Sequence, residues 1–467
     1  MSSLSNDELC YLGASQALAL FRSREISPVQ LLSALISRAE TVEPAINAFS
    51  DTFFERAHAQ AVHAEQVYLH APERARPLEG IPVALKNEHR YIGVHTTQGS
   101  YLCGAEPDTE NAPLTQRLLD SGALIHAQTN VPEFYLAGFT HSRRHGTTRN
   151  PWNRSITCGG SSGGSAASLA AGMTTLASGS DIAGSLRIPA SYCGVVGFKP
   201  SYGRVPEGDF TYAANTHNHN GAMARSVRDC ALMFNVINGP HACDPATVSP
   251  KLILPDAFES IKGLRIAVSY DLGFFDIQSE VHRNTQEVAR TLRDLGAHVD
   301  EVSLAWTSKA RDAITYALGF VLGKPLVATV LEHGDQMNDY VRQFARRALN
   351  ISQAEYFEST AIVAQMHTAL QKVFAEYDVL ICPTMASVAT PAEGAADAHD
   401  DLLRNAMTYP FNLLSRHPVL SIPSGFAANG VPTGLQIVAP TFDDALVMRV
   451  GAALEDALDW NRNRPPL

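Results

Sequence analysis

Short apolar segments and segments of helical periodicity alternate along most of this chain. In one unit, an apolar run at 264–269 precedes a helix-like segment at 280–295, and a second apolar run follows at 298–302. Strands joined through a helix usually pair in parallel, and the connecting helix then lies on a face of the sheet. The alternation therefore predicts an α/β fold in which helices cover both faces of a central mixed β-sheet.

Local signals place the other expected elements. Ser27 followed by Pro28 is typical of a helix start, and this helix is expected to end near Pro44. The stretch 386–401 is rich in Ala, Asp, Gly and Pro and is predicted to be a mobile surface loop. No repeat or linker is evident, so residues 1–467 are expected to form one domain. Helices are also expected at 55–67, 114–121 and 443–458, and strands at 81–85, 123–127, 379–382, 419–422 and 435–438.

The composition argues against several classes of partner. With 36 basic and 47 acidic residues, the net charge is −11, which disfavours binding to nucleic acid. The N-terminus lacks a signal-peptide pattern, and no uninterrupted run of about 18 apolar residues occurs, so no membrane span is expected. The seven cysteines are scattered, which fits a reducing cytoplasm without disulfide bonds. Arg342, Arg346 and Arg347 recur at helical spacing and are interpreted as a solvated helix face.

Two clusters of glycine and serine, at 159–165 and 179–189, are the strongest chemical signal in the chain. Glycine lets several backbone N–H groups point at one ligand atom, and serine supplies a hydroxyl. Ser185 follows small residues in a predicted strand-to-helix turn, so its hydroxyl could attack a carbonyl carbon while nearby N–H groups bind the oxyanion. A flexible linker is the alternative interpretation, which the flanking apolar strands disfavour.

A serine nucleophile needs a base, and no histidine stands in a recognisable relation to Ser185. Lys86 ends the predicted strand at 81–85, where burial could lower its pKa by roughly 3–5 units and leave it neutral. Ser161, in the first cluster, could then relay a proton between Lys86 and Ser185. A surface lysine that merely closes a strand is the alternative for Lys86.

Several segments, in order and spacing, resemble the amidase signature family, whose members hydrolyse amides with a Ser–cis-Ser–Lys triad. The resemblance covers nearly the whole chain. The matching segments are Gly80–Lys86, Thr129–Phe134, Asn150–Trp152, Gly159–Ser165, Asp181–Pro189, Pro432–Val438 and Trp460–Pro465. It implies a signature core at about 75–205 and a variable, substrate-shaping region at about 206–375.

The resemblance also implies a role for each site residue. Ser185 becomes the nucleophile, Ser161 the proton relay after a cis peptide bond, and Lys86 the base, with no metal or cofactor. The N–H groups of Ile182, Ala183, Gly184 and Ser185 would form the oxyanion hole. Ser162, Asp181 and Arg187 would support the loop. Members of the family are often dimers, so a homodimer is an open expectation.

The sequence departs from the family pattern at several positions. Asn87-Glu88 follow the lysine in place of Asp-Asn, a change that could alter how Lys86 is held and thus its pKa. Cys158 replaces a proline, Ala183 a glycine, and Ala127-Gln128 a Gly-Lys pair. His217 and His219 could ligate a metal, but without a third ligand nearby a polar loop is the favoured interpretation.

Three functions remain open at this point. The chain is interpreted first as a stand-alone amidase acting on a small-molecule carboxamide. The alternatives are the glutamine-hydrolysing subunit of a tRNA-dependent amidotransferase and a catalytically silent protein of the same fold. Segments 135–145, 207–220 and 310–360 are expected to shape the substrate pocket. Trp306, Tyr316 and Phe320 hint at an apolar acyl or aryl group.

Overall fold

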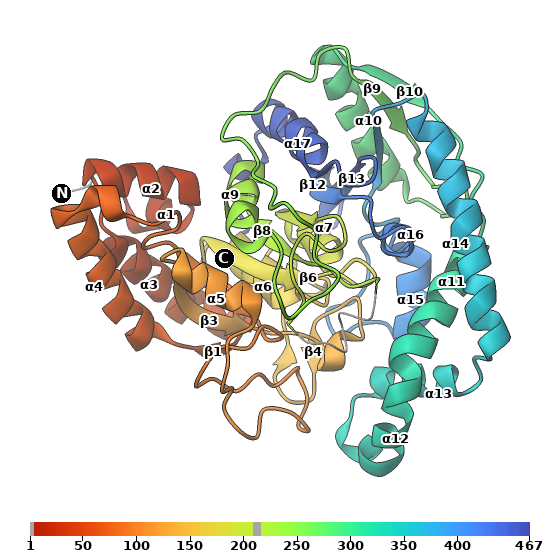
Figure 1. Ribbon diagram of the computed structural model, residues 1–467, viewed down its shortest axis with the longest axis horizontal. Coiled ribbons are helices and arrows are strands. Elements are labelled where there is room, and N and C mark those ends of the chain that lie inside the picture. The colour runs from red at the N-terminus through yellow and green to blue at the C-terminus, as the bar shows by residue number, and fades with distance from the viewer. Residues whose placement is uncertain (1–3, 209–215) are drawn as a thin grey trace.

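The computed structural model describes residues 4–208 and 216–467, and a sheet of eleven strands runs through its centre (Figure 1). The predicted α/β class with a mixed central sheet is confirmed. In spatial order the strands are β1 (Phe49–Thr52), β3 (Leu124–Thr129), β2 (Pro82–Lys86), β6 (Leu176–Ser180), β8 (Asn220–Ala224), β7 (Val196–Lys199), β12 (Val419–Phe426), β13 (Pro432–Val438), β11 (Val379–Pro383), β9 (Arg265–Val268) and β10 (His298–Glu301).

The sheet combines parallel and antiparallel pairs. Strand β2 is parallel to both β3 and β6, and β9 is parallel to β10 and β11. The central strands β8, β7, β12 and β13 pair antiparallel with their neighbours. Each parallel group needs helical crossovers, which explains why helices lie over both faces of the sheet.

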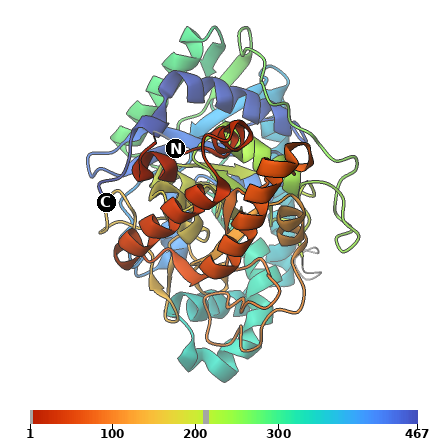
Figure 2. The same cartoon turned by 90° about the vertical axis from the view of Figure 1, so that its left-hand side faces the viewer.

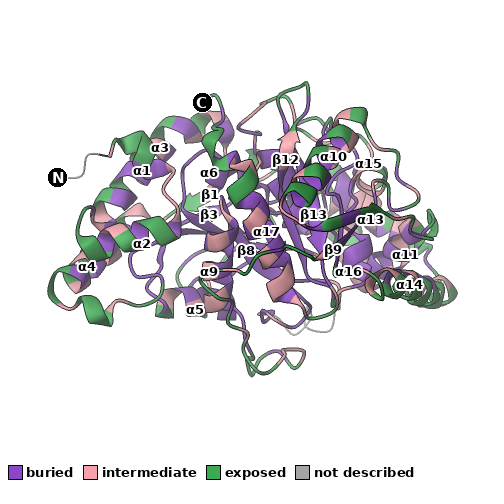
Figure 3. Ribbon diagram, turned by 90° about the horizontal axis from the view of Figure 1, so that it is seen from above, coloured by how far each residue is buried: buried purple, intermediate pink, exposed green. Residues whose placement is uncertain are grey.

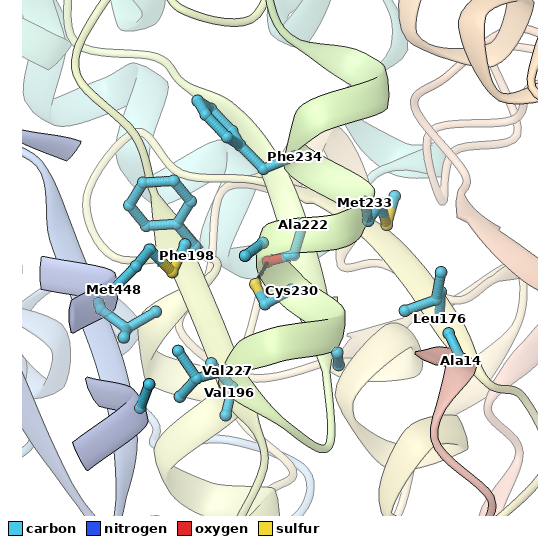
Figure 4. Close-up of a cluster of buried hydrophobic side chains, with 14 of the residues drawn as sticks. Ala14, Leu176, Val196, Phe198, Ala222, Val227, Cys230, Met233, Phe234 and Met448 are labelled. Carbon is cyan, nitrogen blue, oxygen red and sulfur yellow. Dashed lines mark hydrogen bonds between the residues drawn. The ribbon is translucent and has the colours of Figure 1, made fainter. Parts of the chain in front are cut away.

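In several strands, alternate residues pack into different cores. In β2, Val83 and Leu85 belong to one buried cluster, whereas Ala84 belongs to another. The first cluster is covered by α5 (Pro113–Asp120), α9 (Val227–Ile237), α10 (Ser279–Asp294) and α17 (Asp444–Leu458). Figure 4 shows part of it, where Phe198 of β7 meets Phe234 of α9 at a ring-centroid distance of 5.2 Å. Burial of these side chains supplies the main stabilising free energy of the sheet.

The opposite face of the sheet is covered by α6 (Gly163–Ala170) and α7 (Arg187–Cys193), and further along by α11 (Lys309–Leu318) and α14 (Gln353–Phe374). The residues of α6 and α7 are all buried. Small residues such as Ala166 and Ala190 allow these two helices to approach the sheet closely. The site described below lies where these helices begin.

Two groups of helices lie at opposite ends of the sheet. The helices α1 (Asn6–Cys10), α2 (Ala14–Ser23), α3 (Pro28–Ile46) and α4 (Phe54–His70) gather beside β1 and face the viewer in Figure 2. At the other end lie α11, α12 (Lys324–His333), α13 (Asp339–Leu349) and α14, of which α14 is largely exposed along its outer side (Figure 3).

One helical stretch among the described residues, Lys309–Gln336, is long and apolar enough by length and composition to cross a membrane. Its mean hydropathy reaches 1.6, and 28% of that window is buried. The sequence criterion of an uninterrupted apolar run does not detect this stretch because Lys324 falls inside it. The inward side of the same stretch contributes Ile314, Leu318 and Leu322 to the cavity described below.

The predicted helices and strands are present within a few residues of their expected bounds. Three central strands, β6, β7 and β8, were not predicted. Strands β6 and β8 consist mainly of Gly, Ala, Ser and Asn, which have low β propensity and show no alternating pattern. The predicted loop at 386–401 is partly wrong, because α15 (Ala398–Asn405) begins within it. Asp397 caps that helix by accepting a hydrogen bond from the backbone N–H of Asp400.

Candidate active site

Three segments distant in the sequence meet at the carboxyl end of β2. Lys86 is the last residue of β2, Ser161 precedes α6, and Ser185 lies in the turn between β6 and α7. The Nζ of Lys86 donates a hydrogen bond to the Oγ of Ser161 at 2.8 Å. The Gly160–Ser161 peptide bond is cis, as the resemblance led us to expect. The structure therefore brings the three predicted catalytic residues to one place.

Lys86 is fully buried and has three polar partners. Its Nζ donates to Ser161 and, at 2.7 Å, to the Oγ of Ser180, and it forms an ion pair with Glu88 at 2.9 Å. Burial lowers the pKa of Lys86 below its ordinary value, although the charge of Glu88 opposes this shift. A lysine whose pKa is lowered in this way can more readily lose its proton and act as a base.

The turn that carries Ser185 is held in place by Asp181. The carboxylate of Asp181 accepts hydrogen bonds from the N–H groups of Gly184 at 2.8 Å and Leu186 at 3.2 Å. Gly184 has a φ of +127°, and a Cβ there would lie 2.0 Å from the Oγ1 of Thr408. Only glycine fits this position, because both the backbone conformation and the space exclude a side chain.

Asp181 and Arg187 form a buried, bidentate ion pair. The Nε and one terminal nitrogen of Arg187 each lie 2.9 Å from a carboxylate oxygen of Asp181. Burial opposes ionisation of Asp181, but the Arg187 guanidinium outweighs it and holds the pKa of the carboxyl below its usual range. Arg187 also donates to the side-chain oxygens of Gln436 and Asn412. The pair thus ties the turn to β13 and to the segment around Asn412.

The four N–H groups expected to form an oxyanion hole are not equivalent. Within residues 4–208 and 216–467, the N–H groups of Ile182, Ala183 and Ser185 have no hydrogen-bond acceptor. The N–H of Gly184 instead donates to Asp181. Ser162 contributes through its backbone, because its N–H donates to the carbonyl of Ser185 at 3.2 Å. Three donors are therefore free to bind an oxyanion in this arrangement.

The hydroxyl of Ser185 has no hydrogen-bond partner among the described residues, and Ser185 lies at the wall of a cavity. Catalytic hydrogen bonds are often long in unliganded enzymes, so the missing Ser161–Ser185 bond does not exclude a relay. Most of the cavity wall is apolar. Its lining includes Tyr135, Ala137, Ile182, Ala183, Ile188, Ile314, Leu318, Leu322, Tyr340, Phe344, His399, Leu402, Leu403 and Tyr409.

The expected substrate-shaping segments are only partly correct. Segments 135–145 and 310–360 do line the cavity, whereas Glu207 and Asn220 line a second, polar cavity, and 209–215 lie outside the described residues. Neither Trp306 nor Phe320 lines the first cavity, since Trp306 is buried against Phe411 and Phe320 stacks on Tyr356. Tyr316 is absent from that lining as well. Helix α15, whose first four residues fall in the predicted loop, supplies part of the wall.

Sequence reasoning pointed to Glu88 as a residue that could alter how Lys86 is held, and Glu88 does contact Lys86. It missed Ser180, which also contacts Lys86, and Ser178, whose Oγ accepts a hydrogen bond of 3.0 Å from the backbone N–H of Lys86. A second buried lysine, Lys199, donates to three backbone carbonyls. The Ser-Gly-Ser pattern of β6 was the available signal for Ser178 and Ser180, because strand alternation sends both side chains to the same side.

The imidazoles of His217 and His219 lie within hydrogen-bond distance of backbone carbonyl groups. The Nδ1 of His219 lies 3.0 Å from the carbonyl of Asp181, and its Nε2 lies 2.9 Å from the carbonyl of Ser415. The Nδ1 of His217 lies 3.2 Å from the carbonyl of Asn412. In the part of the chain that the structure describes, no group of three His, Cys, Asp or Glu side chains could hold a metal ion.

Comparison with known proteins finds relatives along the whole chain. The family profile described as Amidase matches residues 30–448. An acylamidase from Rhodococcus erythropolis is 32% identical, over 99% of this chain and 98% of that protein. A glutamyl-tRNA(Gln) amidotransferase subunit from Roseiflexus is 34% identical, over 96% of each. Among solved structures, a bacterial aryl acylamidase has a TM-score of 0.89 at 28% identity, with 97% of each chain covered. A 6-aminohexanoate cyclic dimer hydrolase has a TM-score of 0.85 at 28% identity, covering 98% of this chain and 99% of that one.

Proposed function

The chain belongs to the amidase signature family of hydrolases, and we propose that it is a stand-alone amidase for uncharged carboxamides that carry a bulky apolar group. One observation carries the proposal. Among the described residues, most side chains that line the cavity over Ser185 are aliphatic or aromatic, and none is Asp, Glu, Lys or Arg. The polar ones besides Ser185 are Thr315, Gln343 and His399. Such a wall favours an alkyl or aryl substituent and excludes an unpaired charge.

The reaction proceeds through an acyl-enzyme. The Oγ of Ser185 attacks the amide carbon while its proton passes to Ser161 and the proton of Ser161 passes to neutral Lys86. The N–H groups of Ile182, Ala183 and Ser185 bind the oxygen that gains negative charge. The relay then returns a proton to the nitrogen, the C–N bond breaks, and the amine leaves. Water repeats the sequence on the ester and releases the carboxylate.

Two polar side chains of the cavity wall, Thr315 and His399, are within hydrogen-bond distance of each other. The Oγ1 of Thr315 donates to the carbonyl of Arg311 at 2.8 Å and lies 3.1 Å from the Nε2 of His399. Because the Thr315 proton is used, His399 donates its Nε2 proton to Thr315. Burial lowers the pKa of His399, so this imidazole is neutral and adds no charge to the cavity.

Hydrolysis of glutamine within an amidotransferase is the alternative, and several relatives that are named as glutamyl-tRNA(Gln) amidotransferase components support it. Free glutamine carries an α-ammonium and an α-carboxylate, and each would need a charged or strongly polar partner. Among the described residues, the lining holds no charged side chain, and only the amide of Gln343 and the imidazole of His399 could meet the two charges of glutamine. The cavity therefore favours the stand-alone amidase.

A hydrolysis screen of the purified chain tests the proposal. The panel contains anilides and long-chain alkyl amides, matched amides that carry a carboxylate or an ammonium group, and glutamine. We expect turnover of the apolar amides alone, and loss of turnover in Ser185→Ala. A fluorophosphonate should add to Ser185 in the intact protein. Activity on glutamine only, or undiminished activity of Ser185→Ala, would overturn the proposal.

A further inference from the structure

Glu88 contacts Lys86, the proposed base, and occupies a position where the sequence departs from the family pattern. Its Oε2 lies 2.9 Å from the Nζ of Lys86, and it also accepts a hydrogen bond of 2.6 Å from the Oγ of Ser180. Ser180 in turn accepts from Lys86 at 2.7 Å. Lys86, Ser180 and Glu88 thus form a closed triangle beside the Lys86–Ser161 bond.

The geometry at Lys86 is that of an ammonium group. The three N–H bonds of a charged amine are matched by three acceptors, which are Ser161, Ser180 and Glu88. Of these, only Glu88 carries a negative charge. A base needs a lone pair directed at Ser161, so Lys86 must lose one proton before it can act. The carboxylate that stabilises the ammonium also determines how readily that loss occurs.

The groups around Glu88 leave its carboxylate as the main charge beside Lys86. Burial raises the pKa of Glu207 to about 8, and the nearby charge of Glu88 adds to this, so Glu207 is uncharged at neutral pH. Burial also lowers the pKa of His89 and keeps that imidazole neutral. Asp181 is neutralised by Arg187. Arg90 pairs with Glu110, and Asp108, which also lines the polar cavity, accepts a hydrogen bond from Thr96.

The contacts of the next residue, His89, restrict the position of Glu88. His89 lies 2.8 Å through Nδ1 from the Oγ of Ser178 and 3.1 Å through Nε2 from the Oδ1 of Asn220. The side chain of Glu88 is 11% exposed, toward the second cavity that it lines with His89, Glu207 and Asn220. Water in that cavity can exchange protons with Glu88.

We propose that Glu88 is a positioning residue of the proton relay: its carboxylate holds the Nζ of Lys86 between Ser161 and Ser180 and sets the pH at which Lys86 becomes a base. The inference rests on the proposed function of Lys86. As the pH rises, one proton breaks its bond to Nζ and passes by way of Oε2 of Glu88 to water in the second cavity, so that the carboxylate stays charged and the lone pair stays on nitrogen. Rotation about the Cε–Nζ bond then directs that lone pair at Ser161.

The test measures the rate at which a fluorophosphonate labels Ser185 as a function of pH, so that no substrate needs to be known. Labelling requires the activated serine. The fall of the labelling rate at low pH, which we call the acid limb, therefore reports deprotonation of the Lys86–Glu88 pair. Glu88→Gln keeps the size and the acceptor oxygen but removes the charge. Its acid limb should move to lower pH by about one unit or more, because the ammonium loses its counter-charge.

Two further variants make the test decisive. Glu88→Asp keeps the charge farther from Nζ, and its acid limb should lie between those of the wild type and Glu88→Gln. Glu207→Gln replaces a carboxyl whose pKa is about 8 and which is uncharged below that pH, so the labelling rates below pH 8 should keep the pH dependence of the wild type. Circular dichroism verifies folding, and if Glu88→Gln does not fold, the position of the Glu88→Asp limb decides.

The failures of the two hypotheses are distinguishable. Absence of labelling in the wild-type protein would overturn the proposed function itself. If the wild-type protein is labelled normally and the acid limb of Glu88→Gln equals that of the wild type, the role of Glu88 alone is overturned. Glu88→Asp takes the place of Glu88→Gln in this comparison if Glu88→Gln does not fold. A limb that moves to higher pH would also overturn it, since it would mean that Glu88 favours the neutral amine.

Discussion

The Nζ of Lys86 lies 2.8 Å from the Oγ of Ser161, although 75 positions separate the two residues in the chain. Lys86 arrives at this point at the end of β2, and Ser161 arrives in the loop before α6. Both side chains are almost completely buried. A buried amine and a hydroxyl at this distance can exchange a proton without solvent between them.

Lys86→Ala and Ser161→Ala should each lower kcat/KM by roughly 10²–10⁴-fold, the usual contribution of a general base. The double variant should be no slower than the slower single variant, because either change already breaks the same relay. Steady-state kinetics on an apolar amide measure this. Multiplicative losses would mean that the two residues act independently and that the relay is wrong.

Gly184→Ala should destabilise the turn and slow the labelling of Ser185. The added Cβ would lie 2.0 Å from the Oγ1 of Thr408, in a backbone conformation with a φ of +127°. Gly430→Ala is the matched control, because Gly430 has a φ of +79° but open space around it. The control should lower stability by about 1–2 kcal/mol through backbone strain alone, without affecting labelling. Equal effects of the two changes would show that the contact with Thr408 is unimportant.

Asp181→Asn should lower the free energy of unfolding by about 3–5 kcal/mol, because it leaves the buried Arg187 without its counter-charge. Glu287→Gln is the control, since its pair with Arg290 is exposed and should contribute less than about 1 kcal/mol. Chemical denaturation at neutral pH compares the two.

The pH dependence gives a second check on Asp181. Its pKa in the folded state lies below the ordinary value of 3.8, so the stabilisation is complete above that value and is lost as the pH falls below it. The difference between wild type and Asp181→Asn should therefore shrink in acid. A constant difference would contradict the assignment.

Leu322→Trp should narrow the cavity over Ser185 and raise KM for a bulky anilide by tenfold or more, while a small aliphatic amide is little affected. Leu331→Trp lies on the same helical stretch, but Leu331 is 80% exposed and does not line the cavity. It should leave both KM values unchanged. If both variants behave alike, another surface binds the apolar group.

Glu207→Gln should change how stability depends on pH. The ordinary pKa of a glutamate is 4.5, and burial raises that of Glu207 to about 8. Between these values the folded state holds a proton that the unfolded state has released, so stability falls as the pH rises. Thermal melting at pH 5 and pH 8 should show a smaller loss in Glu207→Gln than in the wild type. Identical losses would contradict the raised pKa.

Several elements of the outer fold could be predicted from the sequence because they have strong local patterns, although the helices α11, α12 and α14 at one end of the sheet were not among them. The helix Pro28–Ile46, for example, is capped by Ser27, whose Oγ accepts a hydrogen bond from the backbone N–H of Gln30, and its buried apolar residues recur at helical spacing. The central strands β6 and β8 could not be predicted in the same way. Their small residues provide no pattern, and their strand conformation depends on neighbours that already form a sheet.

The site shows the same division. The two Gly/Ser clusters and Lys86 were recognisable from residue type, order and resemblance. The pairing of Glu88 with Lys86, the contact of Gly184 with Asp181, and the wall supplied by α15 were not. Each depends on the exact three-dimensional placement of side chains, which no local pattern encodes.

The sequence alone determined the α/β class, because strand and helix periodicity act over short distances, and its resemblance to the amidase signature family implied the roles of Lys86, Ser161 and Ser185. The tertiary structure decided which groups surround Lys86 and which side chains face Ser185. Those surroundings govern desolvation and charge at Lys86, and hence its pKa. Such effects depend on distances of a few ångströms between segments that come together only when the whole sheet has formed.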